Sequence, residues 1–239
     1  MKKLFLSFVL LATASLAAVA QKVVKDDQAE TRQVSGFHGV QVSTGIHLFL
    51  TQGDAEAVAV SASSPEYRSR IITEVKNGVL RIYYENKSDF LKRHSKNMEL
   101  KAYVSVKSID ELHVNSGALA DLDGKLQTPS LRLVANTGAI VKGTVDIAEL
   151  KVDQNTGSIV TLAGQAGKIE IDGDTGSIFK GAELQSEHCS ASASTGAGVY
   201  IQVEKELNAR ANTGGFVRYK GSAGIREVKT STGGSISRI

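Results

Sequence analysis

The stretch LKVDQNTGSIVT, residues 150–161, decides the fold, because close variants of it recur through the second half of the chain. A Thr-Gly or Ser-Gly pair returns seven times, at intervals of 18 to 21 residues. Self-similarity at a period near twenty residues is typical of a solenoid, in which one structural unit stacks on the next. The pairs are Ser116-Gly117, Thr137-Gly138, Thr156-Gly157, Thr175-Gly176, Thr195-Gly196, Thr213-Gly214 and Thr232-Gly233.

The residues before each pair alternate between apolar and polar. In the quoted repeat, Leu150 and Val152 are apolar, whereas Lys151 and Asp153 are polar. Alternation with a period of two predicts a strand with one buried face and one solvated face. After the Gly come a small residue and, in most repeats, an apolar pair such as Ile159-Val160. Each repeat therefore predicts two short strands joined at a Thr-Gly corner, with no room for a helix.

Strands that stack on their own equivalents one turn later run parallel. The repeats therefore predict an all-β fold, a right-handed single-stranded parallel β-helix. Coils of about 19 residues are expected over 111–239. Residues 35–110 show similar strand patterns at less regular spacing and predict longer, irregular coils of the same domain. Within them, residues 66–75 are compatible with either one helical turn or a strand.

The residue before each Thr or Ser is usually Asn or Asp. These residues tolerate the left-handed region and can bond nearby backbone groups. Amides stacked in register can also bond between coils. We expect a structural corner ladder rather than a ligand site in this column. Its members are Asn115, Asn136, Asn155, Asp174 and Asn212.

The first twenty residues have the pattern of a secretory signal. Lys2-Lys3 precede the apolar stretch 4–11, and Ala18-Val19-Ala20 form a cleavage site of the A-x-A type. The apolar run is short for a transmembrane helix, which leaves an uncleaved anchor as the less favoured alternative. Residues 21–34 are polar and charged and predict a flexible leader. We therefore expect an exported protein, in the periplasm, on the outer surface or outside the cell.

Net charge is small once the signal is removed. Residues 1–20 contain two of the 28 Lys and Arg residues and none of the 25 acids, so the count falls from +3 to 26 − 25 = +1. A chain this close to neutral gives no indication of nucleic acid or an anionic membrane as a partner. The local cluster Lys92-Arg93-His94 with Lys96 predicts a solvated loop. No integral membrane segment is expected in the mature chain.

The single cysteine, Cys189, excludes an intramolecular disulfide. It falls six residues before Thr195, in the same column as Leu131 and Leu150. We expect that column to face the core, so Cys189 is predicted to be a small buried hydrophobe rather than a nucleophile.

Several segments in both halves of the chain match one known pattern. They are Phe37-His38-Gly39-Val40, Gly45-Ile46-His47-Leu48, Thr51-Gln52-Gly53, Asn77-Gly78-Val79-Leu80-Arg81-Ile82 and the repeats from Leu112 onward. With these segments the chain resembles a bacterial family, the putative auto-transporter adhesin head, or GIN, domain. The resemblance runs from about residue 37 to the end and implies a right-handed parallel β-helix and a role in adhesion, with no catalytic motif. In the family the residue after Gly-Ile is often Asn, whereas here it is His47, so no functional residue is carried over.

The best candidate for a catalytic or ligand-binding site is a group of acidic side chains. Asp153 and Asp172 occupy the same outward column one coil apart, so their Cβ atoms are expected about 5 Å from each other, and Asp174 follows two residues on. Such a spacing suits a retaining glycosidase, and three acids suit a Ca²⁺ site. We favour the interpretation that these acids form a solvated charge ladder, in which Lys151 neutralises Asp153. No cluster of Arg, His or Tyr joins the acids, and the histidines show no metal-ligand spacing.

These observations favour a non-enzymatic, exported module of the cell envelope, adhesin-like in binding a surface or a polymer such as glycan. No cofactor and no metal are expected. The first alternative is a polysaccharide-active enzyme using Asp153, Asp172 and Asp174. The second is a structural envelope protein that forms homo-oligomers through the exposed ends of its coils, where strand edges lack partners.

Overall fold

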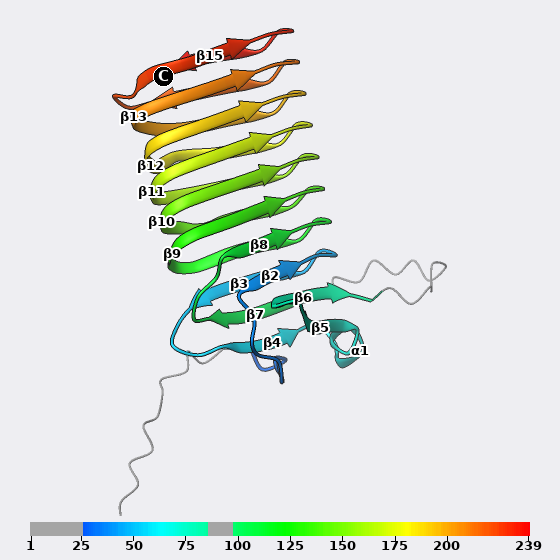
Figure 1. Cartoon of the computed structure of the whole chain (residues 1–239). Helices are drawn as coiled ribbons and strands as arrows, with labels where there is room; N and C mark the ends of the chain where they lie inside the picture. Colours follow the sequence, from blue (N-terminus) through cyan, green and yellow to red (C-terminus); the bar gives the residue numbers. More distant parts are fainter. Residues whose placement is uncertain (1–25, 86–97) are drawn as a thin grey trace, which may run out of the picture.

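The computed structural model describes residues 26–85 and 98–239. The expected signal peptide and the cluster at Lys92, Arg93, His94 and Lys96 lie outside the described residues. The described chain is a β-solenoid of about seven turns, and its only helix there is α1 (Pro65–Arg68). Figure 1 shows the coils stacked one on another along a single rod. The predicted stack of parallel coils of about 19 residues is confirmed.

Five long strands form most of the regular coils, and each runs from one Thr-Gly turn to the next. In these coils the predicted pair of short strands is one strand that bends midway, whereas residues 216–230 form two short strands, as predicted. We call the part after a turn the leading half and the part before the next turn the trailing half. Equivalent residues pair in parallel register, as Val152 does with Leu133 and Ile171. The strands are β9 (Leu119–Ala135), β10 (Ile140–Gln154), β11 (Ile159–Gly173), β12 (Ile178–Ala193), β13 (Gly198–Ala211), β14 (Phe216–Lys220), β15 (Gly224–Thr230) and β16 (Ser235–Arg238).

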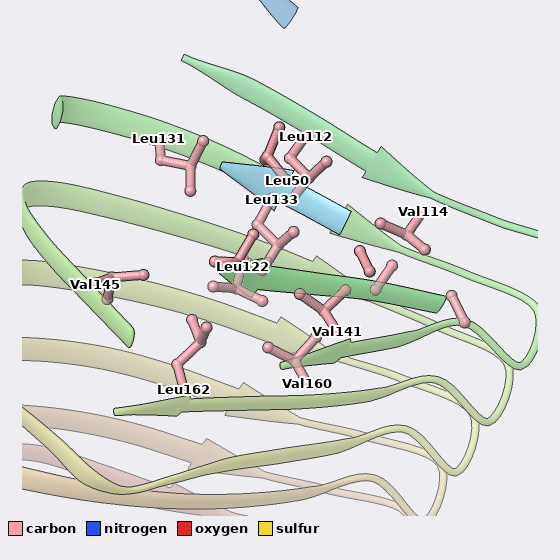
Figure 2. Packing of buried hydrophobic residues seen from close by; sticks show 14 of the residues in the cluster. Leu50, Leu112, Val114, Leu122, Leu131, Leu133, Val141, Val145, Val160 and Leu162 are labelled. Carbon is pink, nitrogen blue, oxygen red and sulfur yellow. The ribbon is translucent and has the colours of Figure 1, made fainter. Parts of the chain in front are cut away.

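The core lies between the two halves of each coil. Figure 2 shows Leu131 and Leu133 from the trailing half of β9 in the same interior as Val141 and Val160 from the leading halves of β10 and β11. All four side chains are at most 1% exposed. Cys189 is 2% exposed in this core, and burial raises the pKa of its thiol to about 12. The prediction that it is a small buried hydrophobe is confirmed.

The Thr-Gly corners contain two consecutive left-handed residues. The seven Thr or Ser residues have φ of 45–53° and the seven Gly residues have φ of 68–76°, the pattern of a type I′ turn. The preceding Asn or Asp is not left-handed, so the expectation of that conformation was wrong. The expected bond to nearby backbone is present at Asn155 and Asp174. The turns also bond one another: the N–H of Gly138 donates to the carbonyl of Thr156, and that of Gly157 to the carbonyl of Thr175, at 2.9 and 3.0 Å.

Strands before residue 115 extend the stack, but not in chain order. β2 (Gly39–Val42) pairs in parallel with both β6 (Val79–Tyr84) and β8 (Glu111–Val114). β3 (His47–Gln52) pairs in parallel with both β7 (Lys101–Val106) and β9. The coil made by β2 and β3 therefore lies between the β6–β7 coil and the first regular coil, although more than fifty residues separate it from the latter in sequence (Figure 1).

The end of the rod near β4 departs from the expected parallel coils. β4 (Ala57–Ser61) pairs antiparallel with β7, and β5 (Ile71–Lys76) antiparallel with β6. Residues 66–75 thus contain both the end of α1 and most of a strand. β1 (Glu30–Arg32) pairs antiparallel with β4, which corrects the expectation of a flexible leader for these residues. The ion pair of Glu30 with Arg68 connects β1 to the end of α1.

No helix in the described part of the chain has the length and apolar character needed to cross a bilayer.

Replacing Gly157 with Ala tests the importance of the left-handed corner. No atom lies within 4 Å of the position a Cβ would take, so the substitution adds no clash and acts only through the φ of +68°. We expect the free energy of unfolding to fall by about 1 kcal/mol, measured by chemical denaturation. Gly53→Ala is the matched control, because its φ is not left-handed and its Cβ would contact only Ser105 Oγ at 3.4 Å. Equal losses in both variants would contradict the argument.

Candidate functional site

The trailing halves of β9 to β12 form an open, polar hollow on the outside of the solenoid. Its volume is about 530 Å³. The alternation along each strand places most of the hollow's side chains opposite the core, although that of Gln154 is buried. The parallel register brings equivalent residues of successive coils together. The lining residues are Arg132, Val134, Asn136, Asp153, Gln154, Asn155, Asp172, Gly173, Asp174, Ser192 and Ser194.

Asp153 and Asp172 are direct neighbours across the parallel register, as their shared column predicts. The cation that neutralises Asp153 is Arg132 of the preceding coil, not Lys151 as expected. Arg132 donates to Asp153 Oδ2 from Nη2 at 2.8 Å and from Nε at 3.2 Å. Lys151 instead donates to Glu170 Oε1 at 2.8 Å. Both ion pairs connect adjacent coils, and one arginine therefore does join the acids.

Asp172 is the carboxyl group in the hollow that least favours ionisation. Loss of solvent around it raises its pKa, and the neighbouring carboxylates Glu170 and Asp153 raise it further, against the opposing effect of Lys151. Within the described residues, Asp172 has no hydrogen-bond or ion-pair partner. Its carboxyl group is therefore available to a ligand.

Asp174 turns away from the other two acids and towards the corner. Its Oδ1 accepts from the N–H of Thr175 at 2.7 Å and from Ser194 Oγ at 2.8 Å. Hydrogen bonds from Thr195, Ser194 and Thr175 lower the pKa of this carboxyl group. Among the residues that the structure describes, no three His, Cys, Asp or Glu side chains come together in a group able to hold a metal ion.

The corner column makes mainly local contacts. Asn155 Oδ1 accepts from the N–H of Thr156 at 2.7 Å, as Asp174 does from Thr175. In 26–85 and 98–239, the one side-chain bond between two members of this column in adjacent coils is that of Ser194 to Asp174. Asn115, Asn136 and Asn212 occupy the equivalent corners, where backbone bonds connect the coils. A structural role for the column remains our interpretation.

A second row of side chains, which is apolar and faces outward, was not predicted from the sequence. The first member of each apolar pair faces outward and is partly exposed, whereas the second is buried, as Ile159 and Val160 illustrate. The signal was present, because two consecutive residues of a strand face opposite sides. We call this row the apolar ridge. Its members are Leu119, Ile140, Ile159, Ile178 and Phe216.

Aromatic side chains lie at both ends of the apolar ridge. Near β3, the His47 ring stacks on Phe49 with centroids 4.1 Å apart, and Phe49 stacks on Tyr103 at 5.2 Å. His47 Nε2 also lies 2.7 Å from Asp121 Oδ2. Near β14, Tyr200 meets Phe216 edge to face at 5.5 Å.

Comparison with known proteins gives a family and a fold. A family model described as putative auto-transporter adhesin, head GIN domain, matches residues 36–223, which confirms the resemblance found in the sequence. No curated protein matches the chain.

Three solved structures show the same fold at low identity. A putative adhesin from Bacteroides fragilis has a TM-score of 0.77 and 17% identity, over 90% of this chain and 98% of that one. A putative adhesin from Parabacteroides merdae has a TM-score of 0.68 and 12% identity, over 88% and 95%. A putative lipid binding protein from Parabacteroides distasonis has a TM-score of 0.64 and 16% identity, over 90% and 98%.

Two conservative substitutions test the electrostatics of the hollow with opposite expected signs. Because the pKa of Asp172 is raised on folding, its charge destabilises the folded state, and Asp172→Asn should raise the Tm at pH 7. Because the pKa of Asp174 is lowered, Asp174→Asn should lower the Tm. Both residues face solvent, so we expect changes of roughly 1–2 °C.

The difference from the wild type should disappear at low pH in both variants. The Asp172 effect vanishes once the pH is below the unfolded pKa of about 3.9, and the Asp174 effect as the pH falls through its lowered folded pKa. Calorimetric melting curves between pH 7 and pH 3 measure both effects. Shifts of the same sign in the two variants would contradict the assignment.

Proposed function

The chain belongs to the putative auto-transporter adhesin head GIN domain family, and on this premise we propose that it is an exported, non-enzymatic binding module of the cell envelope. Family membership supports a non-enzymatic binding protein. The secretory pattern of residues 1–20 supports export. The finer proposal is that the module recognises a polymer such as glycan.

One observation carries the proposal: the hollow presents polar groups on four successive coils, three of them in register. Asp153, Asp172 and Ser192 share one row, whereas Arg132 lies two residues before Val134, the β9 member of that row. Arg132 offers guanidinium donors, Asp153 and Asp172 offer acceptors, and Ser192 offers a hydroxyl group. Equivalent groups recur at the strand spacing of about 4.8 Å. An extended chain of hydroxyl-bearing sugars can meet several such groups at once, and several weak contacts along one ligand add to a useful affinity.

A glycan array probed with the purified mature protein tests this proposal. We expect one class of glycan to be retained and Arg132→Ala to weaken its binding at least tenfold, because the change removes charged hydrogen-bond donors. Lys205→Ala is the matched control, since Lys205 pairs with Glu187 and does not line the hollow. Absence of glycan binding, or equal binding by both variants, would count against it.

A polysaccharide-active enzyme is the alternative that the electrostatics of the hollow favour. Asp172 has a raised pKa beside Asp153, whose carboxylate is held by Arg132. Two neighbouring carboxyl groups that differ in this way can serve as acid and base in glycoside cleavage. Turnover of any bound glycan that is lost in Asp172→Asn would establish the enzyme, whereas binding without turnover supports the module.

Self-assembly through the last coil is the structural alternative. Ile225 and Val228 of β15 are 52% and 44% exposed, whereas Leu207 and Ala209, their equivalents one coil earlier, are fully buried. A second copy packing on this coil would cover them. Sedimentation should then depend on protein concentration, and Ile225→Lys should give a monomer at concentrations where the wild type associates. A wild-type monomer at every concentration would exclude this alternative.

A further inference from the structure

The apolar ridge is continuous across six coils. Leu119, Ile140, Ile159 and Ile178 are paired in register, and the next position in the row is Gly198. Gly198 is in register with Phe216, whose ring occupies the space that a side chain at Gly198 would need. The ring therefore fills the gap in the row. With strands about 4.8 Å apart, the ridge is roughly 24 Å long.

Aromatic rings at the two ends complete this apolar surface. Tyr103 and Phe49 lie beyond one end, in the neighbouring outward row. At the other end, Phe216 belongs to the ridge itself and Tyr200 to that neighbouring row. All four side chains are partly exposed. Tyrosine in particular combines an apolar ring with a polar tip, and such side chains favour the boundary between water and lipid.

The next outward row, beside the ridge, is cationic. From β10 to β14 it contains three cations and no acid, and the one acid next to them in the row is Asp121 of β9, which bonds His47. Lys142 and Lys180 are exposed and, within the described residues, have neither an ion pair nor a side-chain hydrogen bond. Arg218 lies over the rings of Tyr200 and Phe216, at 5.9 and 5.4 Å from their centroids. The row is Lys142, Thr161, Lys180, Tyr200 and Arg218.

The opposite face differs, because most of its described cations are paired, with Lys168 an exception. Arg132 bonds Asp153, Lys151 bonds Glu170 and Arg210 bonds Glu227. The near-neutral net charge of the mature chain therefore hides a difference between the two faces. Most cations of the trailing face have an acidic partner, whereas Lys142 and Lys180 of the leading face have none among the described residues. Net charge gave no indication of this asymmetry.

We propose that the leading face lies on the surface of an anionic lipid bilayer. The ridge side chains enter the boundary between headgroups and acyl chains, the aromatic rings lie at headgroup depth, and Lys142 and Lys180 contact negatively charged headgroups. An apolar strip alone would suit a protein partner equally well, but unpaired lysines beside it favour an anionic surface. The inference is independent of the glycan proposal, since it uses the opposite face and leaves the hollow accessible.

Vesicle flotation with the purified mature protein tests this inference. The probes are vesicles of phosphatidylcholine alone and vesicles of equal parts phosphatidylcholine and phosphatidylglycerol. We expect the protein to float with the anionic vesicles and to bind the neutral ones at least about tenfold more weakly. Raising the salt concentration should release it from the anionic vesicles, because screening weakens the lysine contacts.

Two double variants separate the apolar and electrostatic contributions. Ile140→Thr with Ile159→Thr keeps β-branched residues in the strands while removing apolar surface, and Lys142→Gln with Lys180→Gln removes two charges. Each should weaken binding to anionic vesicles about tenfold or more. Val134→Thr, on the trailing half of β9, is the matched control and should bind like the wild type. If the isoleucine variant fails to fold, the lysine variant still decides, since its side chains are exposed.

Three results would overturn the inference. The first is equal binding to neutral and anionic vesicles or to neither, and the second is unchanged binding by the lysine variant. The third is a solution dimer that dissociates in the isoleucine variant, which would make the ridge an interface between copies of the chain. Arg132→Ala should bind vesicles normally, so a failed glycan experiment and a failed vesicle experiment remain distinguishable.

Discussion

The structure depends on hydrogen bonds between successive Thr-Gly turns. Each turn holds two left-handed residues, and the Gly N–H of one coil donates to the Thr carbonyl of the next, from Gly117 and Thr137 to Gly214 and Thr232. A turn displaced by one residue would lose this bond and would also move its apolar side chains to the solvent face. The corners therefore fix the register, and the core columns, the ion pairs between coils and the apolar ridge all follow from it.

Sequence periodicity predicted the regular coils because their contacts repeat at a constant offset. It did not predict the order of the strands before residue 115, since the coil of β2 and β3 pairs with strands far along the chain on both sides. Nor did alternation distinguish parallel from antiparallel pairing, which is why β4 and β5 were expected as coils. The strand β1 was missed for a similar reason: its ion pairs with Arg68 join residues 38 apart.

The sequence predicted which acidic residues of the candidate site share a column, but it did not predict the hydrogen bonds and ion pairs that they make. Asp153 and Asp172 share one offset from the corner, so stacking alone brings them together. The choice of Arg132 over Lys151 as the partner of Asp153 depends on side-chain reach, which the pattern does not contain. Asp174 has a corner N–H to accept from, and this local bond directs its carboxylate away from the other two acids. The apolar ridge, in contrast, could have been predicted from pairs such as Ile159-Val160, because two consecutive residues of a strand face opposite sides.

Each regular coil except that of Gly198 contributes one side chain to the ridge and at least one to the polar face, and it does so within a single segment of about 19 residues. Tandem duplication of one such segment inside the β9–β13 array would lengthen both surfaces together by about 4.8 Å. Few other contacts would need to be redesigned, because each coil contacts mainly its two neighbours. A gain or loss of whole repeats can therefore change the number of contacts that both faces offer, and with it their avidity, without substitution of individual residues.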